Sequence, residues 1–227
     1  MKITIFTTDW ITSPTIPEDI WILLWLPSNR STVIFFWKKL LTQNIVDDLQ
    51  KSIPYQPMSD GTENAAYVYA NYFLCRKITS NERISLLKAI SEHFPLKLYT
   101  HHPAKELPKA EFIGPVDYYN TMPLVFQNSR INLNITLKSI QTGIPLRRMD
   151  IMGSGSFLLT NFQSDLLDFF IPGEDFVYYE NEDDLISKIN YYLAHEPERQ
   201  QIITNCTEKM RDAHTFEHRV HTMINLL

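Results

Sequence analysis

The fold of this chain is constrained most strongly by residues 132–160, which read NLNITLKSIQTGIPLRRMDIMGSGSFLLT. A β-type run at Arg130–Thr136 is followed by a glycine loop at Gly143–Pro145. A helix-like segment at Leu146–Met152 then ends at Gly153, and a second β-type run follows at Ser156–Thr160. A strand, a helix and a strand in succession form a βαβ unit. Because such a unit joins parallel strands, the sequence predicts a parallel sheet.

Glycine is scarce in this chain, with only six among 227 residues. Four of the six lie in this stretch or just beyond it, namely Gly143, Gly153, Gly155 and Gly173. Glycine tolerates a positive φ and lets another group approach the backbone closely. We therefore expect the functional site to lie in this stretch.

Strands and helices are predicted to alternate over residues 66–227. Further strands are expected at Lys2–Phe6, Ala66–Leu74, Leu96–Thr100, Glu111–Ile113 and Phe176–Tyr179. Further helices are expected at Asn81–Phe94, Met122–Asn128, Asp165–Phe170 (a single turn), Glu182–His195 with Asn181 as its cap, and Glu198–Leu227 with a break near Ala213–Thr215. This alternation predicts a Rossmann-like, doubly wound α/β domain. Ligands of such domains bind at the carboxyl ends of the strands, here near the loops Gly114–Tyr118 and Ser139–Leu146.

Residues 1–65 are predicted to form a separate, short N-terminal α/β extension. The segment Pro54–Glu63, PYQPMSDGTE, is rich in turn-forming residues and is the expected boundary. Ile20–Leu26 and Val33–Leu41 are aromatic and apolar. We interpret these two runs as core or interface packing rather than as a ligand-stacking surface.

The composition excludes several classes of function. A net charge of −5 and a pI near 5.8 argue against nucleic acid as a partner, since phosphate binding needs a basic face. Cys75 and Cys206 form no CxxC pair and favour a reducing compartment. The longest apolar run is too short to span a membrane, and the first ten residues do not resemble a signal peptide. We therefore expect a cytoplasmic protein.

Gly153-Ser154-Gly155 invites comparison with a dinucleotide-binding fingerprint. That motif follows a strand, opens a helix and carries a third glycine. Here the glycines follow a helix and precede a strand, and Leu158 occupies the third position. We therefore interpret them as a helix stop and a tight turn.

Residues 214–218, HTFEH, match H-x-x-E-H, the inverted zinc-protease pattern. In that interpretation His214 and His218 share a zinc ion and Glu217 acts as the base. The sequence identifies no third ligand, and so short a match arises easily by chance in a chain with seven histidines. We favour a polar stripe on the terminal helix and expect no metal.

The loop and helix of Thr142–Met152 offer a third candidate site. A helix N-terminus after a Gly-Ile-Pro loop presents backbone N–H groups and a positive dipole end, which suit a phosphate or diphosphate. Arg147 or Arg148 could add a fork-shaped donor, and Asp150 could accept hydrogen bonds from ribose hydroxyls. A solvated helix with one surface ion pair explains the same residues equally well.

Residues from about Tyr69 to Leu227 resemble the C-terminal domain of family-1-like glycosyltransferases, in particular the CgeB-like spore-maturation group. The motifs that carry this resemblance are NLNIT at 132–136, GIPLRRMDIMGSGSFLLTNFQSDL at 143–166, FIPGEDFVYYENEDDLISKINYYL at 170–193 and HTFEHR at 214–219. The resemblance to the family's closing motif also accounts for the histidines of residues 214–218 without a metal.

This resemblance implies a GT-B architecture in which the C-terminal domain binds a nucleotide-sugar donor. It places seven residues at the donor: Gly114, Tyr118, Asn134, Thr142, Gly143, Arg147 and Asp150. Asp150 matches the acid that holds the ribose, Arg147 matches a diphosphate contact, and Gly114–Tyr118 matches the loop that receives the base. Thr142 stands where the family has a first acid. No metal or other cofactor is implied, and no catalytic residue is assigned.

The resemblance therefore implies transfer of a hexose from a nucleotide sugar to an unknown acceptor. Only about 65 residues precede the donor-like half, less than an acceptor-binding domain normally takes. The alternative is a non-catalytic GT-B-like binding or scaffold module, derived from a shortened or truncated enzyme.

The apolar runs within residues 20–41 lead to a testable expectation. If they form an interface, the purified chain should self-associate through this segment, since exposed apolar patches favour association. Light scattering over a range of protein concentrations should then show an average mass above 26.6 kDa. A strictly monomeric mass at high concentration would exclude this interface.

Overall fold

The computed structural model describes residues 3–6, 43–52, 54–55, 65–101 and 103–226. It divides into two compact units. The first comprises 1–8, 86–136 and 142–227, and the second comprises 9–85 and 137–141. Each unit is described by itself. The apolar runs within residues 20–41 and nearly all of the expected boundary at Pro54–Glu63 lie outside the described residues.

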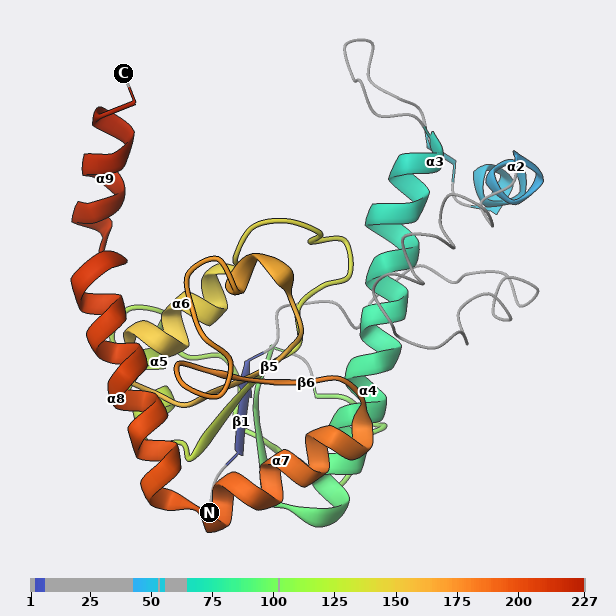
Figure 1. Cartoon of the computed structure of the whole chain (residues 1–227). Coiled ribbons are helices and arrows are strands. Elements are labelled where there is room, and N and C mark those ends of the chain that lie inside the picture. The colour runs from blue at the N-terminus through green and yellow to red at the C-terminus, as the bar shows by residue number, and fades with distance from the viewer. Residues whose placement is uncertain (1–2, 7–42, 53, 56–64, 102, 227) are drawn as a thin grey trace. The chain divides into compact units, whose positions relative to one another are not determined.

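The first unit is built on a parallel sheet. Among the described residues, six strands pair in the order β3-β2-β1-β4-β5-β6, and every pair is parallel. The strands are β1 Ile3–Phe6, β2 Leu96–Tyr99, β3 Glu111–Phe112, β4 Ile131–Asn134, β5 Leu158–Asn161 and β6 Val177–Tyr179. The order runs in one direction from β1 to β3 and in the other from β4 to β6, as in a doubly wound sheet. The predicted Rossmann-like α/β fold is confirmed (Figure 1).

The central strand β1 comes from the very start of the chain. Ile3 pairs with Leu96 of β2 on one side and with Ile131 of β4 on the other. Although the sequence analysis assigned this strand to the N-terminal extension, it lies within the sheet of the first unit. The boundary near residue 65 stays a prediction.

Helices cover the sheet as the hydrophobic periodicity predicts. From Cys75 onward the described residues form helices α4 Cys75–His93, α5 Met122–Gln127, α6 Leu146–Gly153, α7 Glu182–Ala194, α8 Glu196–Ala213 and α9 Phe216–Ile224, with a 3₁₀ turn at Ser164–Leu166. Buried side chains of α5, α6 and α8 form one core with residues of β5 and its following loop: Met122, Phe126, Ile151, Met152, Leu158, Leu166, Phe170, Phe176, Cys206 and Met210. Figure 1 shows these three helices side by side.

Gly153 and Gly155, at the end of α6 and just beyond it, end the helix rather than form a dinucleotide loop. Ser154 N–H donates to Asp150 O at 3.0 Å, and Gly155 N–H donates to Met152 O at 3.1 Å. Gly155 has a φ of +70°, a conformation that side-chain-bearing residues rarely adopt. The interpretation of residues 153–155 as a helix stop is confirmed.

The prediction of a strand at Ala66–Leu74 is wrong. This segment forms helix α3 (Ala65–Val68) and a π-helix (Tyr69–Leu74), which continue into α4. In the second unit, Tyr69 and Leu74 pack with Val46 and Leu49 of helix α2 (Gln43–Ser52). Packing against another helix outweighs the β propensity of the aromatic and β-branched residues, because β propensity depends on context.

None of the helices within the described ranges combines the length and the apolar composition that crossing a bilayer requires.

The cap of α7 provides a test of the fold. The Asn181 side chain accepts a hydrogen bond from Asp184 N–H at 2.9 Å, as the sequence predicted. Asn181→Ala should destabilise the protein by about 1 kcal/mol and lower the Tm by about 2–4 °C. Asn190→Ala, at an exposed position within the same helix, should leave the Tm unchanged or raise it, since alanine favours helix. Equal losses in the two variants would argue against the capping role.

Candidate functional site

Six of the seven predicted site residues lie in loops and a helix that follow strands β3 and β4, and the seventh, Asn134, is the last residue of β4. Gly114 begins the loop between β3 and α5, and Tyr118 lies near the end of that loop. Thr142 and Gly143 precede α6, which carries Arg147 and Asp150. Connections after parallel strands line the edge at which doubly wound domains bind ligands. The predicted residues therefore lie at the edge of the sheet where such domains bind ligands, and their role in binding stays a prediction.

Three of the predicted residues are in direct contact. The Tyr118 hydroxyl donates a hydrogen bond to Asp150 Oδ1 at 2.9 Å, although 32 positions separate them. Arg147 Nη1 lies 3.9 Å from Asp150 Oδ2. Arg147 and Asp150 are three residues apart on α6 and therefore share one face of the helix. We call Tyr118, Arg147 and Asp150 the Tyr–Arg–Asp cluster.

Arg147 also packs against helix α5. Its guanidinium contacts Met122 Sδ, and its Cζ lies 5.8 Å from the centre of the Phe126 ring. Burial against these side chains lowers the pKa of Arg147 from its ordinary value, and the Asp150 carboxylate opposes that shift. About a quarter of the Arg147 side chain is still exposed, so a ligand could reach it.

The environment of Tyr118 favours the neutral phenol. Partial burial raises the pKa of Tyr118, and the hydrogen bond to Asp150 and the charge of that carboxylate raise it further. The guanidinium of Arg147 acts in the opposite direction. A neutral phenol can donate its proton to Asp150, and this bond orients the carboxylate.

The loop around Gly143 is held by side chains that the sequence analysis did not identify. Gly143 N–H donates to Asp165 Oδ2, and Gln163 Nε2 donates to Gly143 O. Gly143 has a φ of +81°, so a residue with a Cβ would be strained there. Gln163 and Asp165 lie shortly after the end of β5 at Asn161, and polar residues that follow a buried strand are the signal that could have pointed to them.

The exposed loop leads into the N-terminus of α6. Thr142, at the position of the family's first acid, is exposed. Pro145 occupies the N-cap position and has no side-chain acceptor for the N–H groups of the first turn. A helix N-terminus of this kind attracts anions.

The Asn134 side chain is buried and forms hydrogen bonds. It is 8% exposed, and its Nδ2 donates to Thr136 Oγ1 at 2.9 Å and to Thr160 Oγ1 at 3.2 Å. Its amide nitrogen therefore joins the carboxyl ends of β4 and β5. Of the two arginines considered in the sequence, Arg148 is fully buried, which leaves Arg147 as the accessible one.

The Gly114–Tyr118 loop is shaped by a glycine and an aspartate. Gly114 has a φ of +92°, which only glycine adopts without strain. Asp117 Oδ1 accepts from Asn120 N–H at 2.6 Å, and Asp117 O accepts from Met122 N–H at 2.9 Å. These bonds form a turn that brings the chain from Tyr118 into helix α5.

Residues 214–218 lie at a break between two helices. Helix α8 ends at Ala213, and α9 begins at Phe216 after its cap Thr215, so His214 and His218 do not share one helix. The centre of the His214 ring lies 4.9 Å from that of the Phe170 ring. Arg219 Nη2 forms a hydrogen bond with His214 Nδ1. Burial, followed by nearby positive charges, lowers the pKa of His214.

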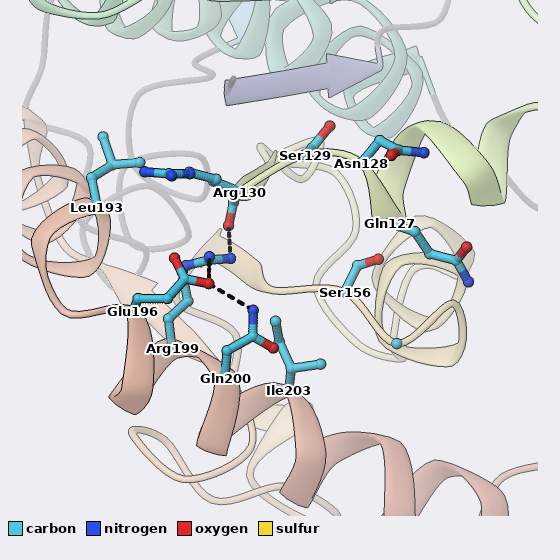
Figure 2. Close-up of a pocket in the computed structure, with 11 residues that line it drawn as sticks. Gln127, Asn128, Ser129, Arg130, Ser156, Leu193, Glu196, Arg199, Gln200 and Ile203 are labelled. Carbon is cyan, nitrogen blue, oxygen red and sulfur yellow. Dashed lines mark hydrogen bonds and ion pairs between the residues drawn. The ribbon is translucent and has the colours of Figure 1, made fainter. Parts of the chain in front are cut away.

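A separate pocket of about 450 Å³ lies at the opposite, amino ends of β4 and β5 (Figure 2). Its lining includes Gln127, Arg130, Ser156, Glu196, Arg199 and Gln200. Arg199 Nη1 donates to Arg130 O at 2.7 Å, and Glu196 Oε1 accepts from both Arg199 and Gln200. Since the side chains of Glu196, Arg199 and Gln200 bond to one another, we assign no ligand to this pocket.

Comparisons with known proteins indicate the family and the fold of this chain. Residues 76–225 match the model of a family described as glycosyl transferase-like. No curated protein matches the chain significantly.

Three solved structures show the same fold. Sucrose-phosphate synthase from Thermosynechococcus elongatus has a TM-score of 0.53 and 15% identity, over 64% of this chain and 41% of that chain. A glycosyltransferase from Rickettsia africae has a TM-score of 0.51 and 11% identity, over 86% of this chain and 54% of that one. TarM from S. aureus, in a complex that contains UDP, has a TM-score of 0.51 and 11% identity, over 65% of this chain and 32% of that chain. This chain therefore spans about half or less of these proteins.

The hydrogen bond within the Tyr–Arg–Asp cluster can be measured. Tyr118 should titrate above the ordinary tyrosine pKa of about 10. Asp150→Asn should lower its pKa, because the negative charge that favours the neutral phenol is removed, but burial should keep the pKa from returning fully to the ordinary value. NMR of ¹³C-labelled tyrosine would follow the titration, and Tyr118→Phe would assign the signal. A titration that Asp150→Asn leaves unchanged would show that the two groups do not interact.

Proposed function

Because the chain belongs to the glycosyl transferase-like family, we propose that it binds a nucleotide-sugar donor and transfers the sugar, a hexose, to an acceptor. Its parallel sheet has the fold of GT-B glycosyltransferase domains. On the motifs at residues 143–166 and 214–219 we place it in the CgeB-like group. The chain covers 54% or less of the GT-B proteins described above, so the complete activity is part of the proposal.

One observation carries the proposal: Tyr118, Arg147 and Asp150 meet after the strands of a doubly wound sheet, on the helix that follows the Gly143 loop. In the proposed complex the Asp150 carboxylate accepts hydrogen bonds from the ribose hydroxyls. The base lies along the Gly114–Tyr118 loop. The diphosphate lies at the N-terminus of α6, where the helix dipole and Arg147 attract it.

These groups suit the chemistry of glycosyl transfer. An acceptor hydroxyl attacks the anomeric carbon and gives up its proton to solvent, the bond from that carbon to the diphosphate breaks, and the nucleoside diphosphate leaves with additional negative charge. Donors that are already in place stabilise this charge most effectively. We propose that the helix N-terminus and Arg147 do so here without a metal ion.

We also propose a cytoplasmic location. Cys75 and Cys206 are both free and buried, and burial raises the pKa of each thiol to about 12. Such thiols are unreactive and suit a reducing compartment.

Donor binding can be tested by thermal shift with UDP-, GDP-, dTDP- and ADP-sugars. The UDP present in the TarM complex puts UDP-sugars first in this panel. A ligand at a hundred times its Kd stabilises a protein by about 2.7 kcal/mol, which at this size raises the Tm by about 5–10 °C. Asp150→Ala and Arg147→Ala should each reduce or abolish the rise.

The exposed pair Arg211 and Asp212 on α8 offers matched controls. Arg211→Ala and Asp212→Ala remove the same kinds of side chain and should leave the shift intact. EDTA should also leave it intact if no metal takes part. Release of nucleoside diphosphate would identify an active enzyme, and binding without release would identify a donor-binding module. No shift with any nucleotide sugar would contradict the proposal.

A further inference from the structure

Arg148 is a charged side chain in the interior of the first unit. It lies in the first turn of α6 and has 0% exposure. Burying a guanidinium is costly unless it forms hydrogen bonds. Its Nη2 donates to Thr136 Oγ1 at 2.8 Å, to Asn161 O at 3.0 Å and to Asn161 Oδ1 at 3.3 Å.

The two acceptor residues lie at the carboxyl ends of neighbouring strands. Thr136 follows β4 by two residues, and Asn161 is the last residue of β5. They are also bonded to each other, since Thr136 N–H donates to Asn161 Oδ1 at 2.8 Å. Arg148 therefore attaches helix α6 to the carboxyl ends of both strands.

The same network includes Asn134 and Thr160. Thr136 Oγ1 accepts from Asn134 Nδ2 as well as from Arg148, and Asn134 also donates to Thr160 Oγ1. Asn134, Thr136, Thr160 and Asn161 are each at most 9% exposed. Water competes little at such positions, so these bonds are stronger than they would be at the surface.

The geometry of a helix links this network to the Tyr–Arg–Asp cluster. Successive residues of an α-helix point about 100° apart, so Arg147 and Arg148 lie on different faces of α6. Arg147 and Asp150 lie on the face that contacts α5 and Tyr118. Arg148 lies on the face that contacts the ends of β4 and β5. Holding Arg148 in place therefore also determines where Arg147 and Asp150 point.

We propose that Arg148 is a positioning residue for the donor site: its hydrogen bonds to Thr136 and Asn161 set the rotation of α6 and so place Arg147 and Asp150. This inference rests on the proposed donor binding at that cluster. Arg148 is fully buried and so acts through its neighbours rather than by touching the donor.

The direct test replaces Arg148 while the rest of α6 is left unchanged. Arg148→Met should raise the Kd of the nucleotide sugar identified by thermal shift by about 10- to 100-fold, the range that misplacement of binding groups produces. Arg148→Lys should give a smaller rise, because an ammonium lacks the planar fork that reaches both strand ends. Arg211→Met, on the exposed side of α8, is the matched control and should bind like the parent.

Chemical rescue separates positioning from a general loss of folding. In Arg148→Ala, low-millimolar guanidinium should occupy the space of the missing group and restore affinity. Sodium chloride at equal ionic strength should have no such effect. Circular dichroism of each variant would verify that the fold is retained, and Arg148→Lys is the variant to rely on if Arg148→Met does not fold.

A second readout does not depend on any donor. If α6 is released, the Tyr118–Asp150 hydrogen bond should weaken, and the pKa of Tyr118 should fall toward its ordinary value in Arg148→Met but not in Arg211→Met. A folded Arg148→Met with the parent's donor affinity and Tyr118 titration would overturn the inference. If the parent protein binds no nucleotide sugar, the proposed function fails, and the Tyr118 titration alone decides whether Arg148 positions the helix.

Discussion

Parallel pairing of β4 with β1 and β5 is the constraint on which the rest of this structure depends. All four residues of β4 and all four of β5 are buried, as expected for parallel strands that are covered on both faces. Parallel strands require a crossover, and the crossover from β4 to β5 contains α6. The helix that carries Arg147 and Asp150 is therefore present because these two strands are neighbours.

Burial of both faces also forces the polar residues of these strands to find partners inside the protein. Asn132 donates to Phe126 O at 3.1 Å, and Asn134 donates to Thr136 and Thr160. The resulting bonds are local and directional, unlike the apolar contacts of α5, α6 and α8. A packed apolar core holds α6 against the sheet, and the polar bonds determine its register there.

Much of the fold and part of the candidate site could be predicted from local pattern. From Leu96 onward each expected strand and helix is present, because alternation, caps and glycine stops act over a few residues. The segment Ala66–Leu74 was predicted incorrectly because its packing partner, α2, is distant in sequence. The roles of Gln163 and Asp165 at the Gly143 loop were missed for a similar reason, since each lies some 20 positions from that glycine.

The sequence by itself determined the strand–helix alternation, the turn at Gly143, the end of α6 and the edge of the sheet at which the candidate site is proposed. These features depend on side-chain periodicity and on backbone conformations that only glycine adopts easily. Only the tertiary structure decided that β1 lies at the centre of the sheet, that Tyr118 meets Asp150, and that Arg148 rather than Arg147 is fully buried. Adjacent arginines on a helix look alike in sequence, and only the neighbours packed around α6 distinguish the one that faces the sheet from the one that faces the site.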